Sequence, residues 1–225
     1  MTTPFTSNKS SNQNPILRAD DLACVRGDMV LFENLSFDLS QRRCLHVIGA
    51  NGSGKTSLLR IICGLNSAEN GNVIYDGTLL GRSETARAEM AYIGHKDGLK
   101  NELTAIENLR FQQRLEGLSD ENHLDDCLAQ LKILRCADLP AQSLSFGQRR
   151  RLAFARLLLS PKRVWVLDEP FTGIDTQGRS LIESICVQHL ESDGAIIMTH
   201  HQSLDASSIS PFKDELILNE SGHHE

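Results

Sequence analysis

Residues 49–56 read Gly49-Ala50-Asn51-Gly52-Ser53-Gly54-Lys55-Thr56 and match the pattern G-x-x-x-x-G-K-[ST] at every fixed position. An apolar segment, Cys44 to Ile48, precedes them, and Ser57 to Ile62 follows with helical spacing. Strand, glycine-rich loop and helix in this order are typical of a phosphate-binding loop in an α/β protein. A chance glycine turn is the alternative, and the flanking patterns count against it.

The glycines of such a loop let the backbone curl so that its N–H groups point at phosphate oxygens, and the following helix adds the positive end of its dipole. Lys55 is expected to reach the β- and γ-phosphates, and Thr56 to hold Mg²⁺. Kinases, GTPases and ATPases all use this loop, so it predicts nucleotide binding without indicating how the energy is used. The residues of this segment expected to bind ATP are Gly49, Ala50, Asn51, Gly52, Ser53, Gly54, Lys55, Thr56 and Ser57.

Two carboxylates follow the apolar strand pattern of Val164 to Leu167. Asp168 is expected to bind Mg²⁺ through water. Glu169 stands next in line, where a carboxylate can orient the attacking water or accept its proton as a general base. A solvated acidic turn is the alternative interpretation, and the phosphate loop upstream favours the catalytic one.

The remaining chain alternates between strand and helix patterns. From Ile16 onward, short apolar runs such as Leu35 to Leu39 predict a β-rich beginning. Leu103 to Leu139 has few β-branched residues and predicts two or more helices. The alternation predicts a parallel sheet flanked by helices, with a helical insert. The other expected elements are helices at Arg149 to Leu159 and Ser180 to Leu190, and a strand at Ala195 to Thr199.

Composition indicates one enzyme domain. The chain has 225 residues, of which 40% are hydrophobic, enough for a single sizeable core. Its formal net charge of -6 argues against nucleic acid as the main partner. No apolar run approaches the roughly 18 residues that a membrane span needs. Residues 1–15 are polar, lack the features of a secretory signal and are predicted to be a disordered tail, so residues 16–225 are expected to form the domain.

Residues 144–148, Leu-Ser-Phe-Gly-Gln, precede a helical run and resemble the signature motif of ABC ATPases, with Phe146 where the family has glycine. The resemblance implies that Ser145, Gly147 and Gln148 contact the γ-phosphate held by a second copy of the chain in an ATP-sandwich dimer. A helix N-terminus with a serine hydroxyl is a suitable anion site. Residues 172–175 resemble the family's D-loop, which lies along the dimer seam, and Asp175 is its expected contact to the partner's ATP.

Three further positions take their expected roles from this resemblance. His200 closes the last apolar strand and corresponds to the switch histidine that contacts the γ-phosphate, so it is favoured over His201. With Lys55 and Glu169 it completes the expected catalytic set. His95 replaces the family's glutamine that senses Mg²⁺ and the attacking water. Arg26 replaces the aromatic residue that stacks on adenine, and its planar guanidinium could stack instead.

The resemblance covers the chain from about Ile16 to near His201 and implies a P-loop NTPase of the ABC type. Such a fold has a RecA-like parallel-sheet core, an N-terminal antiparallel β region and a helical subdomain, here at about residues 96–156. Residues 94–100 and 103–109, with the two replacements above, are similar to one branch, the ATP-binding subunit of the cytochrome c maturation system, or haem exporter ATPase.

That branch implies ATP and Mg²⁺ as cofactors and an integral membrane permease as partner, the B component, with C and D components nearby. It implies a peripheral location on the cytoplasmic face of the bacterial inner membrane. Lys100 to Asn108 is the segment expected to meet the membrane subunit, with an ordinary solvated helix start as the alternative. No residue is predicted to bind haem. Whether haem itself is exported or ATP drives release of a haem chaperone stays open.

Three other functions compete with this one. The chain could be the ATPase subunit of another ABC exporter. A soluble ABC protein of translation or DNA repair would usually carry tandem domains or long coiled-coil inserts, and neither is visible. A small-molecule kinase would use the same phosphate loop, but the signature and switch motifs count against it. The last four residues, Gly222 to Glu225, could bind a metal and are more simply a mobile end.

Overall fold

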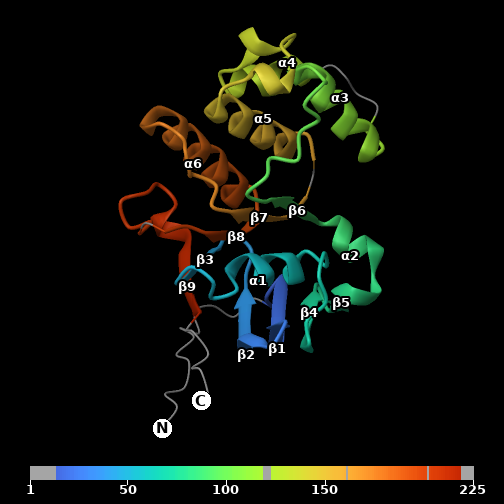
Figure 1. Cartoon of the computed structure of the whole chain (residues 1–225), viewed down its shortest axis with the longest axis vertical. Helices are drawn as coiled ribbons and strands as arrows, with labels where there is room; N and C mark the ends of the chain where they lie inside the picture. The colour runs from blue at the N-terminus through green and yellow to red at the C-terminus, as the bar shows by residue number, and fades with distance from the viewer. Residues whose placement is uncertain (1–13, 119–122, 161, 202, 219–225) are drawn as a thin grey trace.

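The computed structural model describes residues 14–118, 123–160, 162–201 and 203–218. Most of the predicted polar tail, residues 1–13, and the histidine-containing end at 222–225 lie outside these ranges. The described chain forms an antiparallel sheet, a parallel sheet and helices around them (Figure 1). The predicted fold class, a parallel-sheet core with an N-terminal antiparallel region and helices, is thereby confirmed.

The antiparallel sheet has the order β2-β1-β4-β5 and consists of β1 (Leu17–Arg26), β2 (Met29–Leu39), β4 (Asn70–Tyr75) and β5 (Thr78–Leu79). The parallel sheet has the order β6-β7-β8-β3-β9 and consists of β3 (Cys44–Gly49), β6 (Met90–Ile93), β7 (Val164–Asp168), β8 (Ala195–Thr199) and β9 (Lys213–Leu218). Every strand pair in the second sheet is parallel.

The helices are α1 (Lys55–Ile62), α2 (Glu84–Ala88), α3 (Ala105–Leu115), α4 (Leu124–Gln130), α5 (Phe146–Leu158) and α6 (Thr176–Glu191). Short 3-10 turns occur at Leu80–Arg82, Leu134–Cys136, Ala141–Ser143 and Ser210–Phe212. Figure 1 shows α3, α4 and α5 gathered at one end of the molecule and the antiparallel sheet at the other. Within the described ranges, no helix has the length and apolarity to cross a membrane.

The central strands of the parallel sheet are buried on both faces, as their continuous apolar runs require. All five residues of β7 are buried. Trp165 and Leu167 join the core that includes helices α3 to α6. Val164 and Val166 point to the other side and join the core that includes α1 and the antiparallel sheet. The central strands are therefore held by side-chain packing on both faces.

Two helices begin earlier than their apolar spacing predicts, because polar side chains cap them. Ser145 precedes α5, which was expected from Arg149. Asp175 precedes α6, which was expected from Ser180, and its carboxylate accepts the N–H of Gly178 at 2.9 Å. A side-chain oxygen at this position satisfies one of the unpaired N–H groups of the first turn.

Candidate functional site

Four predicted segments lie at one edge of the parallel sheet, past the carboxyl ends of adjacent strands. The phosphate loop follows β3, His200 follows β8, Glu169 follows β7, and His95 lies two residues past β6. These four strands are neighbours in the sheet, and Asp168 is in register with Thr199. The carboxyl edge of a parallel sheet is where ligands bind in open α/β folds. The topology therefore brings distant motifs to one place.

The phosphate loop requires glycine at two positions. A Cβ at Gly49 would lie 2.4 Å from the Ser53 hydroxyl oxygen. Gly54 has a φ of +91°, and a Cβ there would meet Phe32 of β2 at 3.0 Å. The loop is thus pressed between its own serine and the antiparallel sheet. A close backbone approach of this kind leaves the N–H groups free to turn toward a phosphate.

Lys55 opens α1 and folds back over this loop. Its ammonium donates to the carbonyls of Gly49 at 2.8 Å and Ala50 at 2.7 Å, and the residue is only 9% exposed. Because the two carbonyls hold the ammonium against the start of the loop, a bound phosphate would meet a positive charge already in position. The contact of Lys55 with the β- and γ-phosphates stays a prediction.

The hydroxyl of Thr56 connects the loop to the strand that carries the carboxylates. Thr56 Oγ1 donates to Asp168 Oδ2 at 2.8 Å, and Thr199 Oγ1 donates to Asp168 Oδ1 at 2.8 Å. Oxygen donors are what Mg²⁺ prefers, and at phosphate sites it needs only one or two from the protein. Within the described segments, no three His, Cys, Asp or Glu side chains gather as a metal site. The Thr56 and Asp168 oxygens therefore fit Mg²⁺ bound together with a nucleotide.

Glu169 sits on a strained turn. Its φ is +49°, a left-handed conformation that costs a non-glycine residue about 1–2 kcal/mol. The Thr199 hydroxyl accepts its N–H at 2.9 Å, and Thr172 donates to its carboxylate at 3.0 Å. His201 Nε2 lies 2.6 Å from its Oε1. The turn projects the carboxylate beyond the strand end, where its side chain stays 24% exposed.

The two histidines after β8 have different surroundings. His200 is 9% exposed, and its ring meets Phe171 edge-on at 5.2 Å between centroids. Neither of its ring nitrogens has a hydrogen-bond partner in the described structure. Burial, with Arg179 adding like charge, lowers the pKa of His200 to about 4, so the ring is neutral at neutral pH. The structure brings His201, not His200, to the Glu169 carboxylate, and the γ-phosphate contact of His200 stays a prediction.

We expect His200→Gln to lower the ATP turnover number about 10²-fold, the usual cost of losing one donor aimed at developing charge. His201→Gln should lower it less than about tenfold, because His201 is half-exposed and contacts Glu169 rather than the loop. Steady-state phosphate release by both variants checks this, with thermal unfolding recorded alongside. The opposite order of effects would transfer the switch role to His201.

Ser145 and Gln148 form a reciprocal cap on α5. Ser145 Oγ accepts the N–H of Gln148 at 3.3 Å, and Gln148 Oε1 accepts the N–H of Ser145 at 2.8 Å. Phe146 between them is 51% exposed, and a Cβ at Gly173 would lie 2.5 Å from its ring. The start of α5, with Gly147 in its first turn, therefore adjoins the segment that ends at Asp175. Contact of these residues with ATP needs a second copy and stays a prediction.

Arg26 and His95 are both exposed. Arg26 ends β1 and pairs with Met29 across the hairpin tip. Its strand partner β2 packs against the loop at Gly54, so the hairpin lies on the nucleotide side. His95 follows Gly94, whose neighbour Ile93 is in register with Leu167 of β7. Both positions are consistent with their predicted roles, which remain predictions.

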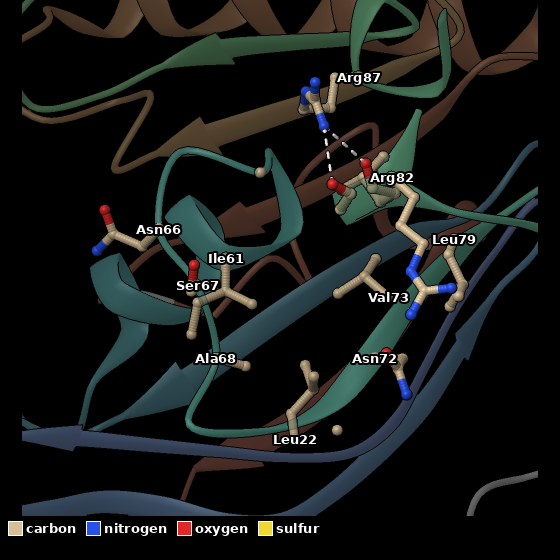
Figure 2. A pocket seen from close by; sticks show the side chains of 14 residues that line it. Leu22, Ile61, Asn66, Ser67, Ala68, Asn72, Val73, Leu79, Arg82 and Arg87 are labelled. Carbon is tan, nitrogen blue, oxygen red and sulfur yellow. Dashed lines mark hydrogen bonds between the residues drawn. The ribbon is translucent and has the colours of Figure 1, made fainter. Parts of the chain in front are cut away.

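Another hollow lies away from this edge. Figure 2 shows a pocket of about 320 Å³ between the end of α1 and β4, lined in part by Asn66, Asn72 and Arg82. Arg87 closes one side by donating to the carbonyls of Leu80 at 3.1 Å and Gly81 at 3.2 Å. Among the described residues that line it there is no carboxylate, histidine or cysteine. The pocket therefore lacks a carboxylate such as the one that Glu169 places at the sheet edge.

Known proteins resemble the chain in sequence and in fold. The ABC transporter family matches residues 32–172. The cytochrome c biogenesis ATP-binding export protein CcmA of Methylococcus capsulatus is 44% identical over 191 residues, 84% of this chain and 92% of that protein. CcmA of Idiomarina loihiensis is 42% identical over 91% of this chain and 94% of that protein.

Solved structures share the fold at lower identity. The ATP-binding subunit of an ABC transporter superposes with a TM-score of 0.82 at 24% identity, covering 92% of this chain and 88% of that one. A dimeric ATP-binding cassette in a post-hydrolysis state with ADP and phosphate superposes with a TM-score of 0.79 at 18% identity. The match covers 92% of this chain and 97% of that one. These likenesses show the architecture.

Proposed function

The chain belongs to the ABC transporter family and, within it, to the cytochrome c biogenesis ATP-binding export proteins, and we infer that it is the ATP-binding and ATP-hydrolysing subunit of such an exporter. The observation that carries the chemistry is the meeting of the phosphate loop, Asp168 and Glu169 at one sheet edge. Lys55 supplies the positive charge of that edge.

We propose a role for each group at this edge during hydrolysis. The loop N–H groups and Lys55 bind the β- and γ-phosphates. Thr56 and Asp168 hold Mg²⁺, which supplies charge neutralisation at the phosphate oxygens when it is bound. Glu169 orients the attacking water and accepts its proton. The strained turn at Glu169 fixes the carboxylate before the nucleotide arrives, which reduces the reorganisation that the reaction requires.

We propose that two copies close around two ATP molecules. Ser145, Gly147, Gln148 and Asp175 of one copy would then meet the γ-phosphate side of the other copy's nucleotide. The reciprocal cap at the start of α5 supports this, because it presents a hydroxyl and N–H groups at an exposed helix N-terminus. A monomer cannot make this contact. Substitution of these residues should therefore weaken dimerisation without weakening the binding of ATP to the monomer.

Ser145→Arg should abolish ATP-dependent dimerisation and leave the monomer's ATP affinity within about twofold, because an arginine occupies the space needed by the opposite γ-phosphate and the phosphate loop is untouched. Size-exclusion chromatography with light scattering, with and without ATP, measures the first, and a fluorescent nucleotide measures the second. Ser184→Arg on the exposed face of α6 is the matched control. Retained dimerisation of Ser145→Arg would contradict the proposed seam.

We propose further that the dimer binds an integral membrane permease, with B, C and D components of the maturation system, at the cytoplasmic face of the bacterial inner membrane. The CcmA relatives support this, since their name describes an export protein of cytochrome c biogenesis. In this chain, Lys100 to Asn108 is the proposed contact. Asn108 is 3% exposed and binds the backbone of Lys100 through its amide, which ties the loop before α3 to the first turn of that helix.

Co-purification from membranes tests the complex. The full chain is isolated after mild solubilisation, its partners are identified by mass spectrometry, and phosphate release is compared with and without them. Recovery of cytochrome c maturation subunits is the expected result. Recovery of unrelated permease subunits would support a transporter ATPase and contradict the cytochrome c assignment. Recovery of an active ATPase without any membrane partner would contradict the transport function.

A further inference from the structure

The guanidinium of Arg150 lies behind the catalytic turn, and all of its donors are used. Arg150 belongs to α5 and its side chain is 3% exposed. An arginine has five N–H donors, and five acceptors surround this one. Nε donates to the carbonyl of Pro170 at 3.2 Å. Nη2 donates to the carbonyls of Asp168 at 2.9 Å and Glu169 at 3.0 Å.

The last donor nitrogen, Nη1, binds a different segment. It donates to the carbonyl of Gly94 at 2.9 Å and to the Asp97 carboxylate at 3.2 Å. The side chain of Asp97 is 7% exposed, and its carboxylate balances the buried charge of Arg150. Gly94 immediately precedes His95, so a single side chain holds the backbone at the ends of the two neighbouring strands β6 and β7, where water and metal are expected.

The contact bears directly on the conformation of Glu169. The residue is left-handed at φ +49°, and its N–H is already bound by the Thr199 hydroxyl. Arg150 binds the carbonyls before, at and after it, so the turn is fixed from β8 on one side and from α5 on the other. Strain of this kind persists only where the surroundings over-determine it. Removing the guanidinium would let the turn relax and move the carboxylate.

We propose that Arg150 is a positioning residue for ATP hydrolysis, which sets the Glu169 turn and the His95 segment relative to α5. The inference rests on the proposed hydrolysis. Its physical basis is the planar fork, because a lysine at the same place has three donors in a different geometry and cannot satisfy five acceptors. Ser145, the proposed contact to the partner's nucleotide, caps the same helix.

Arg150→Lys should lower kcat about 10–10²-fold and leave the KM for ATP within about twofold, because the phosphate loop is untouched while the carboxylate is displaced. Arg150→Gln should behave alike and serves if the lysine variant does not fold. Arg151→Gln is the matched control at the next position, since Arg151 donates to the Gly147 carbonyl of its own helix at 3.3 Å and to no other described residue. The kcat and the KM for ATP of Arg151→Gln should both stay within about twofold of the wild-type values.

The deciding measurement repeats the Arg150 change in a Glu169→Gln background. If Arg150 acts through Glu169, replacing Arg150 in the Glu169→Gln variant should alter the residual rate of ATP hydrolysis by less than about twofold. The carboxylate that Arg150 would position is already absent from that variant. An equal fold loss in both backgrounds would overturn the role of Arg150 and leave it as a structural residue. Wild-type turnover is measured in the same assay, and its absence would instead count against the proposed hydrolysis.

Discussion

Glu169→Gln should slow ATP turnover about 10²–10⁴-fold while ATP still binds, because the amide cannot accept the proton of the attacking water. The substitution is nearly isosteric, so the left-handed turn, its N–H bond to Thr199 and the bond that it accepts from Arg150 should remain. Lys55, Thr56 and Asp168 are unchanged, and they supply the phosphate and metal contacts. Binding and hydrolysis should therefore separate cleanly in this variant.

Single-turnover phosphate release and equilibrium binding of a fluorescent ATP analogue measure the two effects. Glu191→Gln, at the exposed end of α6, is the matched control and should equal wild type. Because hydrolysis is blocked, the variant should also accumulate ATP-bound dimers on a sizing column. Turnover within about threefold of wild type would mean that another group, with His201 the nearest, activates the water.

Lys55→Ala should lose tight ATP binding, with a cost of about 2–5 kcal/mol for removing one partner of a buried charge contact. The alanine also leaves the carbonyls of Gly49 and Ala50 without the donor they now share. The loss should appear in affinity before it appears in turnover, unlike that of Glu169→Gln.

Isothermal titration with ATP and Mg²⁺ checks this, with Lys100→Ala as the control that removes a lysine remote from the loop. Thermal unfolding should show that Lys55→Ala is folded, and added ATP should no longer raise its melting temperature. Wild-type affinity in this variant would show that the loop binds phosphate through its backbone alone.

The central strands could be predicted from sequence because they are apolar on both faces. Ala195 to Thr199 has the same bounds in the prediction and in the structure, and all five residues are buried. Two other strands gave no comparable signal. β9 reads Lys-Asp-Glu-Leu-Ile-Leu, and only Leu216 and Leu218 are buried, since an edge strand has one covered side. β4 opens with Asn-Gly-Asn, residues that normally indicate a turn.

The candidate site likewise contains residues that the sequence could place and contacts that it could not. Motif residues local in sequence, such as Lys55 and Glu169, could be placed by pattern, and the topology then explained why they meet. The pairing of His201 with Glu169 and the reach of Arg150 could not, because both depend on how β8 and α5 pack around the end of β7. Three consecutive arginines look like one solvated surface in sequence, yet only the middle one is buried. The available signal is the helical spacing that places Arg150 on the same face as Ala153, Phe154 and Leu157, which are all buried.

Because the Phe146 ring lies where a Cβ at position 173 would be, the residue types that fit at positions 146 and 173 depend on each other. Position 173 needs glycine twice over, for its φ of +71° and because the aromatic ring fills the space of a Cβ. In lineages where residue 146 becomes small, the second constraint disappears, and asparagine, which tolerates left-handed backbone, becomes admissible at 173. Where an aromatic ring persists at 146, substitutions at 173 should be purged. The two sites should therefore covary among descendants, although 26 residues separate them in the chain.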